Sequence, residues 1–378
     1  MELWTIEHTF IRMKAIKVSF CTTSNLITDQ RIQRAASTLS RNGYQVNVFA
    51  LRRHGLPDEK PFEFAVKRFR CVFSDGPMFY VEYNLKILTR LIFTRTSLIY
   101  SNDLDTLPGC WLASILKAKP LVYDSHELFT EIPELIGHPV KKRLWAIAER
   151  VCIRRAKCVI TVSEGVAKEL STRYGVKPVV VRNFSVKRDK SPYRDLKPTL
   201  IYQGSLNVGR GIELAIDMME WLPCYHLLVI GSGDIEIPLR RRAIERGLTD
   251  RVEFMGRVDP DRLPDVTGRA WLGLSLEEDL GLNYRLALPN KIFDYIASGV
   301  PILVSDLPEM RKIVETYHVG LVANTRDPEK LAGIVADFVE NKMAREVMIN
   351  NVLAASETLC WDNEYPVLLN AVGKAIGC

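Results

Sequence analysis

The sequence lacks any long uninterrupted run of apolar residues. No window of the 378 residues approaches the ~18 apolar residues that a membrane-spanning helix requires. The first residues include the acidic Glu2 and Glu7 and contain no apolar core, so no secretory signal peptide is predicted. Contact with a membrane is therefore expected only from its surface.

The eight cysteines lack the spacing of a disulfide framework or a zinc site. None belongs to a CxxC pair, and most lie in apolar runs such as the one that ends at Cys21. His226 lies close to Cys224, but no second pair of ligands accompanies them, so no metal site is predicted. The pattern indicates reduced, buried thiols in a cytoplasmic protein.

Two further recognition patterns are missing. The order GxGxxG does not occur in the sequence, which disfavours an NAD-dependent enzyme. No nucleic-acid recognition motif accompanies the basic residues, so nucleic acid is not an expected partner.

The composition that remains is that of an ordinary globular protein with an uneven charge. Hydrophobic residues make up 47% and charged residues 25%, and the length predicts two domains or one large one. Residues 1–187 hold 29 Lys+Arg against 17 Asp+Glu, a net charge of +12. Residues 188–378 hold 22 against 28, a net charge of −6. The two halves are expected to meet different partners.

Short apolar, β-branched runs alternate with turns and helical patterns along the chain. Such runs are typical of strands covered by helices on both faces, as in parallel α/β sheets. Strands are predicted at residues 16–21, 45–50, 97–100, 120–123, 158–162, 179–181, 199–203, 226–231, 251–255, 271–275 and 301–304, and helices at 29–42, 211–220 and 291–298.

A polar segment interrupts this rhythm. Residues 187–198 contain two prolines and show no periodicity, which indicates an interdomain linker. The fold prediction is two doubly wound, Rossmann-like domains. Ligands of such sheets bind beyond the carboxyl ends of the strands, so the cleft between the two halves is the predicted site.

Two glycine-rich turns follow predicted strands. The first, Gly204–Gly211, precedes a helix, and its Arg210 is suited to bind a phosphate. The alternative is an ordinary turn with a solvated arginine. The second, Gly231-Ser-Gly-Asp234, is a weaker signal of cofactor binding, because a tight structural turn explains it equally well.

Two further segments carry polar groups beyond strand ends. Residues 277–294 form an acidic loop that leads through Pro289 into a helix beginning with Asn290 and Lys291. These groups are suited to sugar hydroxyls and to an anion, although a solvated acidic loop is the simpler alternative. His126, flanked by Asp124 and Glu127, is a candidate hydrogen-bond donor or structural residue.

Taken in order, these motifs resemble the retaining GT-B glycosyltransferases of family 4 over nearly the whole chain. The landmarks lie at residues 28–31, 42–44, 102–107, 123–127, 160–164, 202–206, 210–211, 289–294 and 299–301. The resemblance implies an acceptor domain at residues 1–187 and a nucleotide-sugar-binding domain at 188–359. It also implies a C-terminal helix at 360–378 that crosses back to the first domain.

The resemblance also implies roles for individual residues. Arg210 and Lys291 match the cations that neutralise the donor diphosphate, His126 matches a histidine near the sugar, and Asp294 matches the acidic residue that contacts the ribose. Positions expected to bind the donor are Gly204, Ser205, Gly231, Gly233, Gly256, Arg257, Val258, Asn290 and Asp294.

The sequence departs from the family pattern at two places in the second half. Ser205 stands where the family commonly has arginine, so one phosphate contact is either missing or supplied by Lys291. The Glu-x7-Glu spacing is not met either, because Leu286 stands eight residues before Asp294. We assign the first acidic role to Glu278, across a longer loop.

The function implied is transfer of a sugar from a UDP- or GDP-type donor to an anionic or lipid-linked glycan, with retained configuration. No metal is expected, because no Asp-x-Asp motif stands in a convincing place; Asp103-Leu-Asp105 has this form but lies in the predicted acceptor half. The alternatives are a nucleotide-sugar epimerase or hydrolase and a non-catalytic partner subunit. Residues 79–93 and 138–157 are basic and amphipathic, which fits an anionic membrane surface or ordinary packing on a sheet.

Overall fold

A computed structural model describes residues 15–27, 29–52, 61–135, 137–188 and 194–377. The N-terminal segment, Thr28 of the first landmark and residues 189–193 of the predicted linker lie outside the described residues.

The described residues form two separate parallel sheets, and the first has seven strands in the order β3-β2-β1-β4-β5-β6-β7. The strands are β1 (Lys17–Thr22), β2 (Gln45–Leu51), β3 (Ala65–Phe69), β4 (Leu98–Asn102), β5 (Leu121–Ser125), β6 (Cys158–Thr161) and β7 (Val179–Val180). The helices between them are α1 (Gln30–Arg41), α2 (Gly76–Phe93), α3 (Leu107–Leu116), α4 (Pro139–Ile153) and α5 (Glu164–Tyr174).

The second sheet has six strands in the described part of the chain, in the order β10-β9-β8-β11-β12-β13. The strands are β8 (Thr199–Gln203), β9 (His226–Ile230), β10 (Val252–Gly256), β11 (Leu272–Ser275), β12 (Ile302–Ser305) and β13 (Gly320–Ala323). The accompanying helices are α6 (Ile212–Met218), α7 (Glu236–Glu245), α8 (Leu263–Thr267), α9 (Leu282–Arg285), α10 (Asn290–Ala297), α11 (Pro308–Tyr317), α12 (Pro328–Glu340), α13 (Lys342–Thr358) and α14 (Trp361–Ile376).

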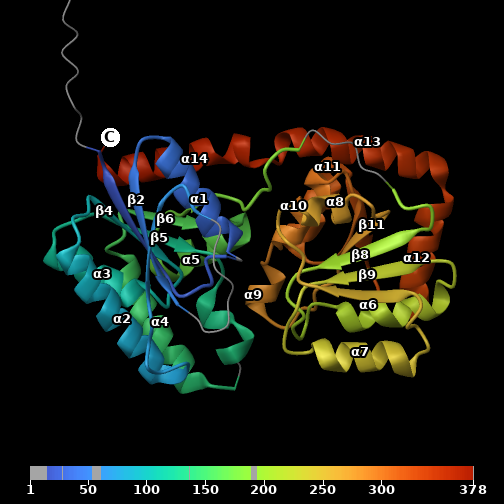
Figure 1. Cartoon of the computed structure of the whole chain (residues 1–378), viewed down its shortest axis with the longest axis horizontal. Coiled ribbons are helices and arrows are strands. Elements are labelled where there is room, and N and C mark those ends of the chain that lie inside the picture. Colours follow the sequence, from blue (N-terminus) through green and yellow to red (C-terminus); the bar gives the residue numbers. More distant parts are fainter. Residues whose placement is uncertain (1–14, 28, 53–60, 136, 189–193, 378) are drawn as a thin grey trace, which may run out of the picture. The chain divides into compact units, whose positions relative to one another are not determined.

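Each sheet reverses its strand order beside its first strand. β1 lies between β2 and β4, and β8 lies between β9 and β11. In the second sheet, α6 and α7 cover one face while α8, α10 and α11 cover the other (Figure 1). The predicted fold class of two doubly wound sheets is therefore confirmed, and the carboxyl ends of β8 and β11 are the expected ligand crevice of the second.

Spatial contacts divide the chain into two compact units that do not coincide with the two sheets. One unit comprises residues 1–124, 151–158 and 372–378, and the other comprises 125–150 and 159–371. Helix α14 begins in the second unit and its last residues belong to the first. The linker predicted at 187–198 lies between the last strand of one sheet and the first strand of the other.

Apolar side chains on both faces of the second sheet fix its position between the helices. One core cluster joins the sheet to α6 and α12, and another joins it to α10 and α11. At Gly273 of β11 any side chain would overlap the ring of Tyr295, because a Cβ atom would lie only 2.4 Å from that ring. This close contact holds α10 directly against the carboxyl half of the sheet.

A buried polar group supports the carboxyl end of β5 in the first sheet. Arg31 of α1 donates through Nε and Nη2 to both carboxylate oxygens of Asp124, at 3.2 and 2.7 Å. The hydroxyl of Tyr100 also donates to Asp124, at 2.7 Å. Only 6% of the Arg31 side chain and 2% of the Asp124 side chain are exposed, so neither charge has access to water if its partner is lost.

This pair yields a stability prediction. The Arg31→Met variant leaves the Asp124 carboxylate buried without its counter-charge, and we expect the free energy of unfolding to fall by about 3–5 kcal/mol. The matched control is Arg41→Met on the same helix, whose pair with Glu63 is largely exposed and is worth about 1 kcal/mol or less. Urea denaturation measures both, and equal losses would contradict this description of the pair.

Candidate functional site

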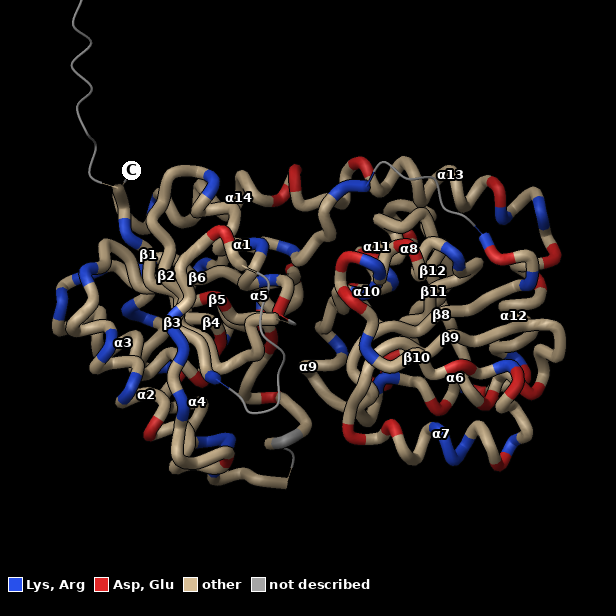
Figure 2. Tube along the Cα trace, viewed as in Figure 1, with Lys and Arg blue, Asp and Glu red and all other residues tan. Residues whose placement is uncertain are grey.

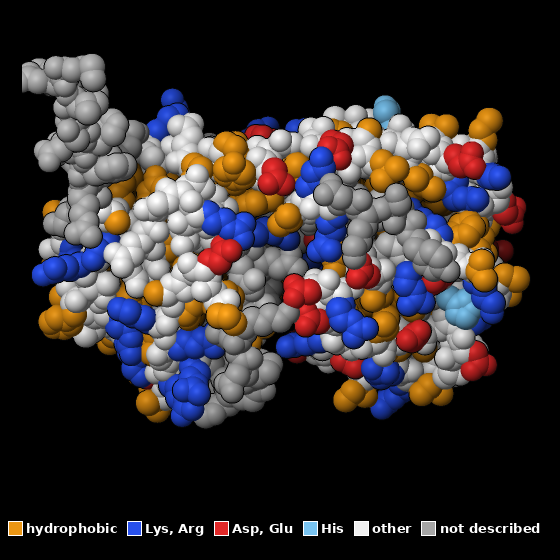
Figure 3. Space-filling model, turned by 45° about the horizontal axis from the view of Figure 1, so that its top comes forward, with side chains coloured by type: hydrophobic (Ala, Val, Ile, Leu, Met, Phe, Trp, Pro, Cys, Tyr) orange, Lys and Arg blue, Asp and Glu red, His pale blue; other side chains and the backbone are white. Residues whose placement is uncertain are grey.

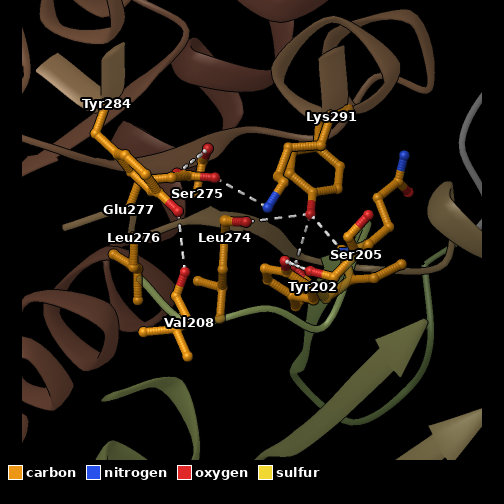
Figure 4. A network of polar contacts seen from close by, with 12 residues as sticks. Tyr202, Ser205, Val208, Leu274, Ser275, Leu276, Glu277, Tyr284 and Lys291 are labelled. Atoms are coloured by element: carbon orange, nitrogen blue, oxygen red, sulfur yellow. Dashed lines mark hydrogen bonds and ion pairs between the residues drawn. The ribbon is translucent and has the colours of Figure 1, made fainter. Parts of the chain in front are cut away.

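The carboxyl ends of β8 and β11 meet the start of α10 at a buried ion pair (Figure 4). Lys291 is the second residue of α10, and only 8% of its side chain is exposed. Glu277 stands two residues after β11 with a fully buried side chain. The Lys291 Nζ and Glu277 Oε1 atoms are 3.0 Å apart, so each charge offsets the other.

Lys291 also reaches the first glycine-rich turn. Its Nζ lies 3.8 Å from the centre of the Tyr202 ring, which is a favourable cation–π distance. A Cβ atom at Gly204 would lie 3.5 Å from Lys291 Cε and 3.7 Å from Nζ. The lysine therefore presents its charge at the turn that follows β8, next to Ser205.

The Glu277 carboxylate has a hydroxyl partner as well as a charged one. The Ser275 hydroxyl donates to Glu277 Oε2 at 2.7 Å. Burial by itself would raise the pKa of the Glu277 carboxyl, but the charge of Lys291, the hydrogen bond from Ser275 and the charge of Arg210 together lower that pKa below its usual value. Glu277 is therefore ionised at neutral pH.

The alternation of strand residues explains why Glu277 faces α10. Side chains point to opposite faces at successive positions, so Gly273, Ser275 and Glu277 share one face of β11 and its extension. Gly273 packs on Tyr295 of α10, which identifies that face. On the helix, Lys291 and Tyr295 are four residues apart and lie on the same side. The two periodicities bring Glu277 and Lys291 together.

The structure places a different carboxylate beside Lys291 from the one chosen on the sequence. Sequence reasoning selected Glu278, but the carboxylate beside the predicted diphosphate cation Lys291 is that of Glu277. Glu278 is the next residue along the chain, so the alternation assigns it to the opposite face of the strand extension. Its partly exposed side chain pairs with Arg326 at 3.2 Å. Extending the alternation of β11 past Ser275 is the signal in the sequence that would have identified Glu277.

Arg210 lies in a turn that packs tightly on the loop after β11. Its guanidinium carbon is 5.4 Å from the centre of the Tyr284 ring, and the Tyr284 hydroxyl donates to the Val208 carbonyl at 3.0 Å. Gly211 has a φ of +72°, and a Cβ atom there would lie 1.9 Å from the Leu276 carbonyl oxygen. Only glycine fits this position. The close backbone contact places Arg210 near enough to Glu277 for its charge to lower the pKa of that carboxyl.

The second glycine-rich turn packs directly on the first. The amide of Gly204 donates to the Ile230 carbonyl at 2.9 Å, and the amide of Leu206 donates to the Ser232 carbonyl at 3.1 Å. A Cβ atom at Gly231 would lie 1.8 Å from the Gly204 carbonyl oxygen, and one at Gly233 would lie 2.4 Å from that of Leu206. Both glycines thus have a packing role in shaping the Gly204 turn; their contact with a donor stays a prediction.

The residues predicted to lie near the nucleotide base are the last residue of β10, Gly256, and the two that follow it, at the edge of the second sheet. The Gly231 amide donates to the Gly256 carbonyl at 2.8 Å, and Arg257 Nε donates to the Ser232 hydroxyl at 2.6 Å. Val258 packs its side chain against the apolar core. Gly256 and Arg257 therefore lie beside the second glycine-rich turn.

Asp294 is held by a chain of buried donors. Gln203 Nε2 donates to Asp294 Oδ2 at 3.0 Å, and the Ser185 hydroxyl donates to Oδ1. Gln203 is itself fixed by the Thr267 hydroxyl, which donates to its Oε1 at 2.8 Å. Sequence reasoning missed Gln203 and Ser185, which orient the carboxylate that was predicted to contact a ribose.

The remaining predicted residues lie around this centre or in another segment. Asn290 is exposed at the first position of α10, and Ser205 is exposed in the turn. His126 directly follows β5 of the first sheet and is half-buried. The structure thus brings together Gly204, Ser205, Arg210 and Lys291, while the role of His126 stays a prediction.

Two features are absent from the part of the chain that the structure describes. No group of three or more His, Cys, Asp or Glu side chains in that part of the chain is arranged to hold a metal ion. None of the described helices combines the length and the apolar character needed to cross a membrane.

The contact between the two turns yields a prediction. Gly231 has a φ of +133°, and an alanine there would be strained and would overlap the Gly204 backbone. We expect Gly231→Ala to lower the free energy of unfolding by about 2–5 kcal/mol. Gly333→Ala is the control, because that helical position has no atom within 4 Å of a Cβ; it should stabilise α12 by about 0.5–1 kcal/mol. Chemical denaturation checks both signs, and a neutral Gly231→Ala would contradict the packing role.

Two family models together match residues 30–354. Residues 30–184 match the model described as Glycosyltransferase Family 4, and residues 183–354 match Glycosyl transferases group 1. The boundary between the two matches falls between the two sheets.

Relatives and solved structures give the same result. An uncharacterised glycosyltransferase of Methanocaldococcus jannaschii is 26% identical over 360 residues, spanning 87% of this chain and 89% of the relative. Chitobiosyldiphosphodolichol beta-mannosyltransferase of Candida albicans is 24% identical over 60% of this chain and 56% of its own length. The crystal structure of Anabaena HepE with UDP and glucose superposes with a TM-score of 0.74 at 16% identity, covering 96% of this chain and all of HepE. The chain therefore belongs to the GT-B glycosyltransferases of family 4 type.

Proposed function

We propose that the chain transfers a sugar from a nucleoside-diphosphate sugar to an acceptor, and that the donor diphosphate binds at the Gly204 turn. The observation that carries this proposal is the position of Lys291 and Arg210 at the strand-order reversal of the second sheet. Ligands of doubly wound sheets bind at such reversals, and glycine turns let a phosphate approach the backbone closely.

The electrostatics of the reaction fit this placement. When the bond between the sugar and the diphosphate breaks, negative charge accumulates on the departing phosphate. Cations that are already fixed near that phosphate stabilise the transition state more than the ground state. The Arg210 guanidinium supplies a delocalised positive charge, and the amides at the start of α10 add a positive partial charge.

Two finer features follow from the same arrangement as proposals. The reaction would need no divalent metal, because Arg210 and Lys291 provide the positive charge that a metal would otherwise supply at the diphosphate. Glu277 is already engaged by Lys291 and Ser275, so we do not assign it the role of a covalent nucleophile. Retention of configuration would then follow from attack by the acceptor on the face of the sugar that the diphosphate leaves.

We further propose a lipid-linked acceptor reached at the cytoplasmic face of a membrane. The name of the Candida albicans relative describes action on a dolichol-linked substrate. The described cysteines form no disulfide, which suits a cytoplasmic protein. Basic side chains intersperse with apolar ones on the surface of the N-terminal half (Figure 3).

Helix α4 carries the surface best suited to anionic lipid, and Figure 2 marks its basic residues. Its exposed apolar residues repeat at intervals of four, three and four positions: Val140, Leu144, Ile147 and Val151. Exposed cations flank this row: Lys141, Arg143, Arg150 and Arg154. The acidic Glu149 is buried and accepts a hydrogen bond from Tyr174 at 2.7 Å. A row of apolar side chains between cations complements an anionic membrane surface.

The α2 segment is less suited to this role. It buries Phe79, Tyr83, Ile87 and Leu91. This burial agrees with the alternative interpretation of the segment, ordinary packing on a sheet. Its Lys86 pairs with Glu82 and donates to a backbone carbonyl. Of the two amphipathic segments we therefore select α4.

The cation assignment is tested by turnover. Purified protein is supplied with a panel of UDP- and GDP-sugars, with and without EDTA, and with lipid-linked glycan acceptors. Arg210→Ala, which leaves the buried pair in place, and Lys291→Ala should each lower kcat/KM by about 10²–10³-fold. Lys330→Ala, an exposed lysine of α12, is the matched control and should leave kcat/KM unchanged.

Several results would contradict the proposal. An active Lys291→Ala variant would remove this lysine from the diphosphate site. Products formed from the donor without any acceptor would instead indicate an epimerase or hydrolase. The anomeric configuration of the product, read by NMR, tests retention directly, and inversion would contradict that feature alone.

The membrane proposal is tested by sedimentation with vesicles. At ~0.05 M salt the protein should bind vesicles rich in phosphatidylglycerol and should release from them at ~0.5 M salt, because exposed charges are then screened. The double variant Leu144→Glu/Ile147→Glu should bind at least about tenfold more weakly, since two apolar side chains no longer enter the lipid. Met343→Glu changes a comparably exposed residue of α13 and should bind normally. Equal binding by all three proteins would contradict the assignment to α4.

A further inference from the structure

We infer that Glu277 is a positioning residue of the donor site, which holds Lys291 charged and against the Gly204 turn. The inference rests on the proposed function, because it assigns to Glu277 a role in binding the donor diphosphate. It also explains the departure at Ser205: the turn has no basic side chain of its own at that position and receives its charge from α10 instead.

The surroundings of Lys291 require such a partner. The side chain is almost fully buried, with the ammonium over the Tyr202 ring and beside Gly204. Burial of this kind favours the neutral amine, since an ammonium without a counter-charge loses its hydration. Glu277, at 3.0 Å, provides that counter-charge.

Arg210, Tyr295 and Tyr202 also face the pair. Arg210, from the turn before α6, contributes a positive charge that acts on Glu277. Tyr295, on the same helix as Lys291, also interacts electrostatically with Glu277 and Asp294; burial raises the pKa of its phenol well above the ordinary value, so it stays neutral. Tyr202 contributes its ring and donates its hydroxyl to the Ser205 carbonyl at 2.8 Å. Glu277 is therefore the negatively charged group that pairs with Lys291.

Glu277 affects a bound diphosphate in two opposite ways. It keeps Lys291 protonated, which favours the ligand, but its own negative charge repels the phosphates. With Arg210 and Lys291 positive and Glu277 negative, the cluster carries one net positive charge. Removing the carboxylate should therefore help binding where Lys291 remains charged and weaken binding where it does not. A merely structural role for Glu277 would weaken binding at every pH.

The test is the pH dependence of UDP and GDP binding, measured by isothermal titration calorimetry in EDTA from pH 6 to pH 9. The dissociation constant of each variant is divided by that of the wild type at the same pH, which cancels titration of the nucleotide itself. For Glu277→Gln we expect a ratio of one or below at pH 6 and a ratio of about ten or more at pH 9. The reason is that the pKa of a buried lysine can fall by several units when its counter-charge is removed, so the variant would lose the Lys291 charge at high pH. Glu346→Gln, an exposed control on α13, should give a ratio of one throughout.

A second variant identifies the cause of the high-pH loss. Glu277→Gln/Lys291→Arg carries a side chain that does not deprotonate, so its ratio should not rise between pH 6 and pH 9. A ratio for Glu277→Gln that is constant across the pH range, or a rise that persists in the double variant, overturns the inference. If Glu277→Gln does not fold, Glu277→Asp replaces it; the longer separation from Lys291 should give a smaller rise with pH, and a flat ratio overturns the inference. Failure of the wild type to bind either nucleotide would instead reject the proposed function.

Discussion

A lysine can remain charged inside a protein only when a counter-charge or strong hydrogen-bond acceptors lie close to it. Beside the second sheet this constraint is met by the 3.0 Å pair of Lys291 and Glu277, and much of the surrounding structure serves to assemble it. Lys291 projects from the start of α10, and Glu277 extends the face of β11 that packs on the same helix. The close contact between Gly273 and the Tyr295 ring sets the separation of strand and helix at which the two side chains meet.

The glycine-rich turns complete the arrangement by removing side chains where backbones must touch. Gly231 lets the end of β9 contact the Gly204 carbonyl, and Gly211 lets the Arg210 turn contact Leu276. Gly204 itself stays exposed, with the Lys291 side chain beside it. The same glycines that resemble a phosphate-binding motif thus have a structural explanation, and both explanations hold together: a turn shaped by backbone packing is what allows an anion to approach amides and a lysine at once. The net charges of the two halves fit this reading, since the acidic half needs only a few placed cations.

The fold could be predicted from the sequence wherever strands are central. β8 was predicted at its observed bounds, and α10 was predicted within one residue, because continuous apolar runs and helical periodicity are strongest in fully buried elements. The edge strands β3 and β13 were missed. β3 alternates exposed and partly buried residues, and β13 fully buries only its last residue, so neither has the continuous burial of a central strand. Within the site, Arg210 and Lys291 could be predicted from the motifs, but the choice between adjacent Glu277 and Glu278 depends on strand parity beyond the end of β11. The contacts of Asp294 with Ser185 and Gln203 join residues about a hundred positions apart, which no local pattern reveals.

The central claim is that the crevice at the ends of β8 and β11 binds a nucleoside diphosphate through the Gly204 turn and the start of α10. Amide hydrogen exchange followed by mass spectrometry, with and without saturating UDP or GDP, tests this claim most directly. The account predicts slower exchange in peptides covering residues 204–211 and 290–294 on nucleotide binding, with little change in α12 or α13. Nucleotide binding that leaves both of those segments unprotected, or that protects the first sheet instead, would contradict it.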